Sequence, residues 1–261
     1  MITTIINDCR DANAVGRQIA RASLLLKSPV NFIGVASELE ASGNIIDILD
    51  ATEGQENVIL VNVAPRNGQA KKWKNGTPFG YFWYKQTLVV TSVDGITLSL
   101  VKKLNLTDSV NVLDLPTVVD ILIKEGYLTS DLKNYIANTQ FRSYDFLPRV
   151  GAYLFKNKNI ESVATPMADF AEAPQAVWFV DNFGNCKTTL LPEEIKLSED
   201  KKVITRFGEL DLFTRLADVP EKTTALVIGS SGLGHHRFLE VMSQGADTAK
   251  KLNLASGDLI I

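Results

Sequence analysis

The beginning of the chain alternates short apolar runs with a segment of helical periodicity, and this alternation constrains the fold more than any other sequence feature. Apolar runs occupy residues 2–6, 31–36 and 58–63. After Asp11, which is predicted to be an N-cap, apolar residues recur every three or four positions up to residue 26, which predicts one buried face of a helix. Strands that alternate with helices predict a largely parallel sheet with helices packed on both faces.

The following residues extend this domain and then lose their periodicity. Aromatic and β-branched runs at residues 79–84 and 87–91 predict two neighbouring strands. Further expected elements are a strand at 110–113 and helices at 118–124, 128–137 and 147–155. Residues 161–174 contain two prolines and no clear period, which indicates a linker that ends an N-terminal α/β domain at residues 1–160.

Residues 175–261 read as a second, smaller domain made mostly of short strands. Turn residues separate expected strands at 177–180, 186–190, 203–206, 210–213 and 225–228. A helix at about 246–252 and a terminal strand at 259–261 follow. This pattern predicts a small β-barrel-like or sandwich domain.

Charge and composition exclude several function classes. The net charge is −3 and the pI is near 5.5, which argues against a general nucleic-acid binder because phosphate binding needs a basic surplus. No strongly apolar, uncharged window reaches the about 18 residues of a membrane span, and the N-terminus lacks the basic region of a signal peptide. Cys9 and Cys186 form no metal or disulfide spacing, so we expect two thiols in a cytoplasmic protein. With two histidines in the chain, we expect no His-rich metal site.

Two segments, residues 229–236 and 180–190, could bind a ligand or could simply form turns. Residues 229–234, GSSGLG, follow an expected strand but precede no GK[ST] motif, so a turn is favoured over a phosphate cradle. The adjacent His235 and His236 are expected in an exposed loop. Residues 180–190, VDNFGNCKTTL, predict a hairpin because Asp and Asn favour turns. An aromatic ring between a carboxylate and an amide can also stack a purine and bind an amino-acid head group.

The same VDNFGNCKTTL segment resembles the D-x-F-G-N-x-x-T-N signature of the S-adenosyl-L-methionine (SAM) hydroxide adenosyltransferases, relatives of the SAM-dependent fluorinase and chlorinase. Other blocks resemble this family in its own order and span nearly the whole chain. These blocks are INDCRDANAVG (6–16), NVAPRNGQAKK (62–72), TLVVTSVDGITLSLV (87–101), TQFRSYDFLPRVGAYL (139–154), GSSG (229–232) and FLEVMSQGADTAKKLNLASGDLI (238–260). The two C-terminal blocks are the more specific ones.

The resemblance implies an N-terminal α/β domain joined to a C-terminal β-barrel-like domain, in agreement with the pattern of elements above. It also implies a homotrimer in which SAM binds between the N-terminal domain of one subunit and the C-terminal domain of a neighbour. The implied reaction is attack of hydroxide on the ribose C5′ of SAM, which gives adenosine and methionine. SAM is then the substrate or ligand, and no further cofactor is expected.

Several positions match residues that bind SAM in the family. The resemblance implies that Asp8 holds the ribose hydroxyls, a task that suits a carboxylate because it accepts two hydrogen bonds side by side. It implies that Asp181 and Asn185 hold the methionine end, with Phe183 near the adenine. The turn that closes over the ligand matches Ser230 and Ser231.

The family's Asp-Arg-His triad is not kept. Its positions fall on Ala64, Lys71 and Arg142. Alanine cannot accept a proton, and arginine stays protonated at ordinary pH, so neither serves as a general base. Lys71 and Arg142 would instead favour an anion, and Ser143 matches the serine that contacts halide in the fluorinase-like branch.

Three functions therefore stay open: a slow SAM hydrolase, a SAM- or adenosine-binding protein without catalysis, and an adenosyltransferase that uses another anion such as a halide. A carboxylate from elsewhere in the chain could replace the lost base, and Asp94 and Asp145 are the candidates. Each also has a structural interpretation, because Asp94-Gly95 is typical of a turn and Asp145 of a helix N-cap.

Overall fold

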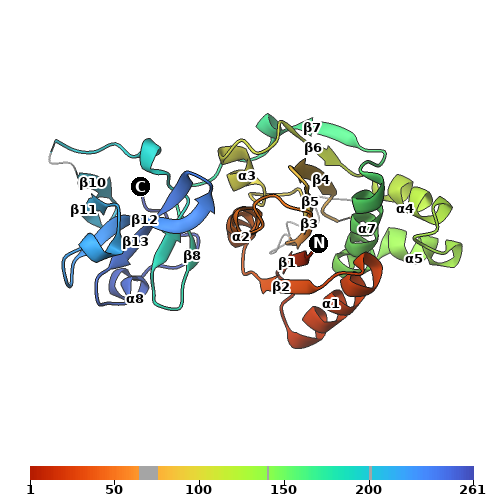
Figure 1. Ribbon diagram of the computed structural model, residues 1–261, viewed down its shortest axis with the longest axis horizontal. Coiled ribbons are helices and arrows are strands. Elements are labelled where there is room, and N and C mark those ends of the chain that lie inside the picture. The colour runs from red at the N-terminus through yellow and green to blue at the C-terminus, as the bar shows by residue number, and fades with distance from the viewer. Residues whose placement is uncertain (65–75, 140, 200–201) are drawn as a thin grey trace. The chain divides into compact units, whose positions relative to one another are not determined.

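The computed structural model describes residues 1–64, 76–139, 141–199 and 202–261, which divide into two compact units, Met1–Ala171 and Glu172–Ile261. Each unit has its own sheet and its own apolar core (Figure 1). The expected fold class is confirmed: a first unit with helices on both faces of a mixed sheet, and a smaller β-rich second unit. In the described ranges, no helix is long and apolar enough to cross a membrane.

The first unit contains a seven-stranded sheet in the order β2-β1-β3-β5-β4-β6-β7. Its first four strands are parallel, and the remaining three alternate in direction from β5 onward. The strands are β1 (Thr3–Asn7), β2 (Val30–Gly34), β3 (Asn57–Asn62), β4 (Phe79–Tyr84), β5 (Thr87–Ser92), β6 (Ser109–Val112) and β7 (Val163–Pro166). The edge strand β7 lies inside the segment that we expected to be a linker. Its side chains are mostly exposed, and backbone pairing with β6 holds it in the sheet.

Helices cover both faces of this sheet. α1 (Ala12–Leu26) and α7 (Leu147–Asn157) pack on one face, and α2 (Glu38–Ala51) and α3 (Ser99–Lys103) lie on the other (Figure 1). The remaining helices are α4 (Leu115–Lys124), α5 (Lys133–Asn138), α6 (Arg142–Asp145) and the short 3-10 helices η2 (Ser130–Leu132) and η3 (Met167–Asp169). The apolar run of β3 is buried on both faces, as expected for a central parallel strand.

Helix termini explain part of this arrangement. Asp11 caps α1 as predicted, because its side chain accepts hydrogen bonds from the backbone N–H groups of Asn13 and Ala14. The helix ends at Leu26, before Pro29. The helix expected at 128–137 begins instead as the 3-10 helix η2 and continues as α5.

The second unit contains a six-stranded sheet in the order β10-β11-β12-β13-β9-β8. Its elements are β8 (Val177–Val180), β9 (Cys186–Thr188), β10 (Lys202–Thr205), β11 (Gly208–Phe213), β12 (Thr224–Leu233), β13 (His236–Ser243), α8 (Thr248–Leu252), and the 3-10 helices η4 (Pro192–Glu194) and η5 (Leu216–Asp218). Among the described residues no ladder joins β10 to β8, so the sheet is not a closed barrel.

The C-terminal residues connect the two ends of this sheet. Leu259 forms an isolated bridge with Ala176 next to β8, and the Ile260 carbonyl accepts a hydrogen bond from the Arg206 N–H between β10 and β11. The predicted terminal strand at 259–261 is therefore a single bridge rather than a strand. This connection makes the unit barrel-like without full closure.

The glycine-rich segment 229–234 differs most from expectation. We expected a turn there, and instead residues 229–233 belong to the ten-residue strand β12, with a β-bulge between Ile228 and Gly232. The strand pairs with β13, so the turn is formed at Gly234 and His235. His236 begins β13, and its Nδ1 lies 3.2 Å from Glu193 Oε1.

Candidate functional site

Three candidate positions follow neighbouring strands at the carboxyl edge of the first sheet. Asp8 follows β1, Ala64 lies just beyond β3 and Asp94 lies just beyond β5. The Ala64 N–H donates a hydrogen bond of 3.2 Å to Asp8 Oδ2. Asp94 is half-buried, and its strand lies two strand spacings, about 10 Å, from that of Asp8. Ligands of parallel α/β sheets bind at this edge.

A buried pair of amides fixes the turn that carries Asp8. Asn7 Nδ2 donates to Gln18 Oε1 at 2.6 Å, and Asn7 Oδ1 accepts from the Cys9 N–H at 2.8 Å. Gln18 Nε2 in turn donates to the Cys9 carbonyl at 3.3 Å. Asn7 is fully buried and Gln18 is 1% exposed. The pair joins α1 to the end of β1 and thereby orients the backbone on both sides of Asp8.

Replacing Gln18 with leucine is expected to destabilise the protein by about 1–3 kcal/mol, because the Asn7 amide and the Cys9 carbonyl each lose a buried partner. Urea denaturation measures this change. Asn13→Ala, an exposed change on the same helix, is the control and should leave stability within about 0.5 kcal/mol. A Gln18→Leu protein as stable as the wild type would show that the amide pair contributes nothing.

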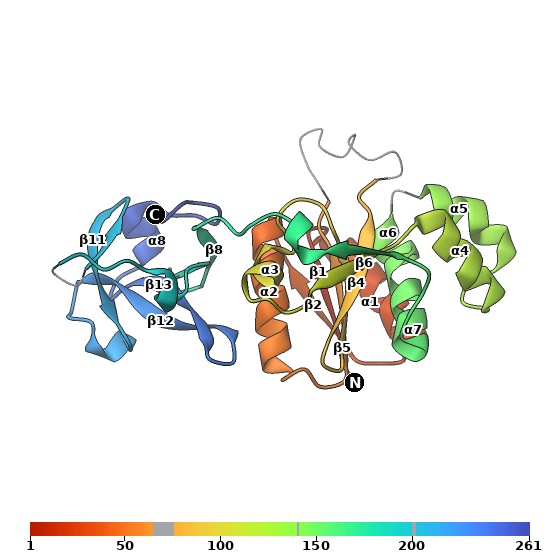
Figure 2. The same cartoon turned by 90° about the horizontal axis from the view of Figure 1, so that it is seen from above.

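Helix α6, which begins at Arg142, lies near the same edge of the sheet (Figure 2). Arg142 Nη1 donates to the Thr77 carbonyl at 3.3 Å, and Thr77 lies just before β4. Burial lowers the pKa of this half-buried guanidinium. No residue in the described part of the chain forms an ion pair with this guanidinium. Ser143 is the next residue of α6, and Lys71 lies outside the described residues.

Asp145 has a structural role that differs from the expected helix cap. It is the last residue of α6, it is 3% exposed, and its Oδ2 accepts a hydrogen bond from Thr139 Oγ1. Its Oδ1 lies 3.8 Å from Arg21 Nη1 of α1. The carboxylate joins α6 to α1, whereas Asp94 follows β5 at the sheet edge that carries Asp8.

In the second unit, Asp181 organises the turn between β8 and β9. Its Oδ1 accepts hydrogen bonds from the N–H groups of Phe183 and Asn185, at 2.8 and 2.9 Å. Its Oδ2 accepts from Asn185 Nδ2 at 3.0 Å. The structure thus brings Asp181 and Asn185 together and holds their side chains in one orientation. The predicted hairpin turn is confirmed here.

The turn presents an aromatic ring to its surroundings. Phe183 is 71% exposed, so its ring is accessible to a ligand. Gly184 has a φ of +83°, and a Cβ there would clash with Asp247 Oδ1. Asp247 is the N-cap of α8, and the Ala249 N–H donates to the Gly184 carbonyl at 2.9 Å. Glycine is therefore required where α8 packs against the turn.

Acidic groups surround the start of β9. Burial, and to a smaller extent the carboxylates of Asp181, Asp247, Asp258 and Glu240, together raise the pKa of the Cys186 thiol to about 12. Two of these carboxylates already lie beside a cation: Asp247 Oδ2 is 2.9 Å from Lys250 Nζ, and Asp258 Oδ1 is 3.6 Å from Arg206 Nη2.

A thiol reagent at pH 8 is expected to label the exposed Cys9 and leave the buried Cys186 unmodified, because only a thiolate reacts and Cys186 stays protonated. In the unfolded state the Cys186 thiol ionises near its ordinary pKa, so its contribution to stability decreases as the pH rises from about 9 towards 12. Mass spectrometry counts the labels in native and urea-unfolded protein. Two labels on the native protein would contradict the assignment.

Ser230 and Ser231 lie in the bulge of β12 next to two charged side chains. Lys187 Nζ donates to Ser231 Oγ at 2.7 Å and lies 5.6 Å from the Trp178 ring centroid. The Ser230 N–H donates to Oε1 of the buried Glu240 at 3.2 Å. These two hydrogen bonds connect the bulge to β9 and β13.

Sequence reasoning missed the residues that support the candidate positions. They are the amides Asn7 and Gln18 in the first unit, and Lys187, Glu240 and Asp247 in the second. Asp247, before a short helical segment, had a recognisable N-cap pattern. The others depend on contacts between elements distant in sequence.

Comparisons with known proteins support the fold. No protein-family model matches the chain, and no curated protein matches it. Among solved structures, an uncharacterized conserved protein from Thermotoga maritima is similar over 100% of both chains, with a TM-score of 0.67 and 17% identity. A conserved hypothetical protein from Thermus thermophilus is similar over 99% of both chains, with a TM-score of 0.55 and 17% identity. These similarities extend over nearly the whole chain and concern its fold alone.

Proposed function

We propose that this chain binds SAM and cleaves it slowly with water to adenosine and L-methionine, as its resemblance to the hydroxide adenosyltransferases implies. The observation that carries the proposal is the turn in which Asp181 and Asn185 are held beside the exposed Phe183 ring. SAM carries an ammonium group at its methionine end, and Asp181 offers that group a carboxylate held in one orientation by the turn.

Each half of the proposed site binds a different part of SAM. Asp181 and Asn185 bind the methionine end, Phe183 contacts the adenine, and the Ser230-Ser231 bulge closes over the ligand. In the first unit, Asp8 accepts hydrogen bonds from the ribose hydroxyls. Its backbone is held on both sides by the Asn7–Gln18 pair and its carboxylate by the Ala64 N–H, which fits a fixed binding group.

Cleavage forms a bond from the water oxygen to C5′ and breaks the bond between C5′ and sulfur. The electron pair of that bond neutralises the sulfonium, which leaves as methionine, and the water's proton passes to a base or to solvent. Positioning and desolvation of the nucleophile supply as much as about 7–11 kcal/mol of the barrier. Loss of the general base costs about 10²–10⁴-fold in rate. Asp94, at the edge that carries Asp8, is the proposed proton acceptor.

Arg142 favours a second candidate, in which another anion replaces hydroxide. Its guanidinium is half-buried, has a lowered pKa and forms no ion pair with a described residue. Such a group stabilises an anionic nucleophile, a halide for example, and Ser143 beside it would contribute a hydroxyl donor.

Incubation with SAM at neutral pH, with and without chloride, tests both candidates. Chromatography follows adenosine, methionine and 5′-substituted adenosine, with Asp181→Ala protein purified in parallel as the matched control. We expect adenosine and methionine above the control in both arms. A chloride-dependent 5′-chloro product would favour the second candidate, and SAM left intact in both arms would contradict cleavage and leave only binding.

We also propose that the protein is a homotrimer, since the resemblance implies sites shared between subunits. Light scattering is expected to give three times the chain mass of 28.7 kDa. A monomeric mass at the concentration of the SAM assay would contradict shared sites, because each site would then lack half of its walls.

A further inference from the structure

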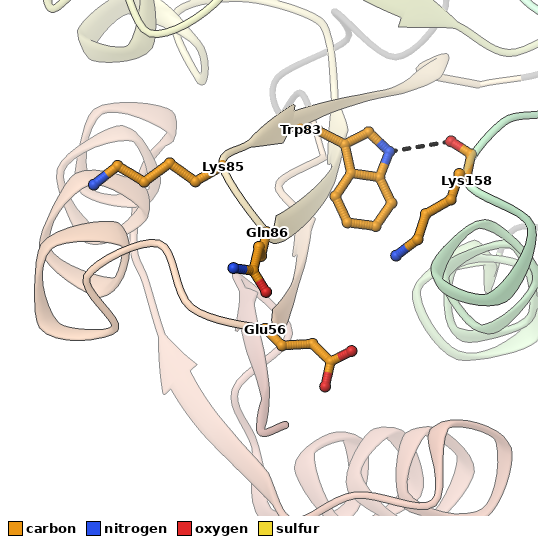
Figure 3. Close-up of a pocket in the computed structure, with 5 residues that line it drawn as sticks. All are labelled: Glu56, Trp83, Lys85, Gln86 and Lys158. Carbon is orange, nitrogen blue, oxygen red and sulfur yellow. Dashed lines mark hydrogen bonds between the residues drawn. The ribbon is translucent and has the colours of Figure 1, made fainter.

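A cavity of about 350 Å³ opens at the other end of the first unit's strands, away from the carboxyl edge (Figure 3). Glu56, Trp83, Lys85, Gln86 and Lys158 line it. Glu56 precedes β3, Lys85 and Gln86 form the turn between β4 and β5, and Lys158 follows α7. None of these residues belongs to the proposed SAM site.

Two groups of opposite charge line the cavity without neutralising each other. No described residue forms an ion pair with the Glu56 carboxylate or with the Lys158 ammonium, and the two are not paired together. In Figure 3 both charged ends lie on the side of the cavity below the Trp83 ring, whereas Lys85 points away. Lys85 Nζ lies 3.5 Å from the Glu53 carbonyl oxygen. The cavity therefore offers one acidic and one basic partner.

The Trp83 ring lies next to these two charged groups. Trp83 Nε1 donates to the Lys158 carbonyl at 3.1 Å, which fixes the indole, and the ring stacks on Phe155 with centroids 6.5 Å apart. Lys158 Nζ lies 4.3 Å from the Trp83 ring centroid, so the ammonium is held at the ring by a cation–π contact. The Gln86 side chain adds an amide donor and acceptor.

We propose that this cavity binds a small zwitterion, a free α-amino acid with an apolar side chain. The ligand's ammonium pairs with Glu56, its carboxylate with Lys158, and its side chain packs on Trp83. The volume is at the lower end of the range for small-molecule sites, about 300–1,000 Å³, which suits a single amino acid. Exposed ion pairs contribute modestly, so the affinity is expected in the millimolar range.

Titration of ¹⁵N-labelled protein with L-phenylalanine tests this proposal, with the Trp83 indole N–H resonance as the probe. Trp83→Phe assigns that resonance. We expect a saturable shift with L-phenylalanine. Phenethylamine and 3-phenylpropionate each lack one charge and should bind at least about threefold more weakly.

Glu56→Gln and Lys158→Asn should each weaken L-phenylalanine binding by a similar factor, about threefold or more. Both residues are exposed, and asparagine tolerates the left-handed backbone at 158, so the fold should be kept. Lys156→Gln, an exposed change in the last turn of α7 and outside the cavity, is the matched control. The proposal is overturned by the absence of a saturable shift, or by equal binding of the variants or of the single-charge analogues. Neither result depends on SAM.

Discussion

Asp181→Ala is expected to abolish SAM binding in a calorimetric titration, with a loss of about 100-fold or more in affinity. The carboxylate accepts three hydrogen bonds within the turn and is proposed to accept another from the methionine end of SAM. Hydrogen bonds to charged groups contribute about 1.5–3 kcal/mol each, and the variant loses both the ligand contact and the turn that holds Asn185.

Two further variants separate a direct contact from a general loss of structure. Phe183→Ala removes an exposed ring and none of the turn's hydrogen bonds, so it should weaken SAM binding while unfolding at the wild-type temperature. Asp218→Ala removes a carboxylate of the same unit that pairs with Arg215 on the surface, and it should bind SAM normally. Wild-type affinity in the Asp181→Ala protein would remove Asp181 from the site.

Gly232→Ala is expected to destabilise the second unit by about 3 kcal/mol and to weaken SAM binding with it. The glycine has a φ of +132°, which L side chains rarely adopt. A Cβ there would clash with the His236 carbonyl oxygen and lie 2.9 Å from Arg237 Cα. Since both obstacles are backbone, the β12–β13 hairpin has to shift, and Ser230 and Ser231 shift with it.

Hydrogen exchange of the β12 and β13 amides localises this effect, and urea denaturation gives its size. Gly234→Asn is the matched control in the same hairpin. Residue 234 has a φ of +59° and open space around it, so asparagine should cost about 1 kcal/mol or less. Equal stability of the Gly232→Ala and Gly234→Asn proteins would show that the bulge tolerates a side chain.

Local patterns predicted the elements whose sequence reflects burial. The run at 58–63 predicted β3 because a central parallel strand is apolar on both faces, and Asp11 predicted the start of α1. The edge strand β7 has mostly exposed side chains and is held by backbone pairing with β6, so no apolar pattern marks it. The strand β12 continues through the glycine-rich segment 229–233 because it pairs with β13. Local turn propensity carries no information about that pairing.

The sequence predicted those parts of the candidate site whose residues lie close together along the chain. The Asp181–Asn185 turn forms within five residues, so turn chemistry alone predicted its hairpin. The Asn7–Gln18 pair depends on how α1 packs on β1, and both residues read as ordinary polar positions in the sequence. Asp145 resembled a helix cap, yet its ion pair with Arg21 could be seen only once α6 and α1 were placed together.

Calorimetric titration of the wild-type protein with SAM tests the central claim most directly. We expect saturable binding, with adenosine and methionine competing for the same site and the Asp181→Ala protein giving no binding heat. Absence of saturable binding by the folded wild-type protein at millimolar SAM would contradict the proposed function.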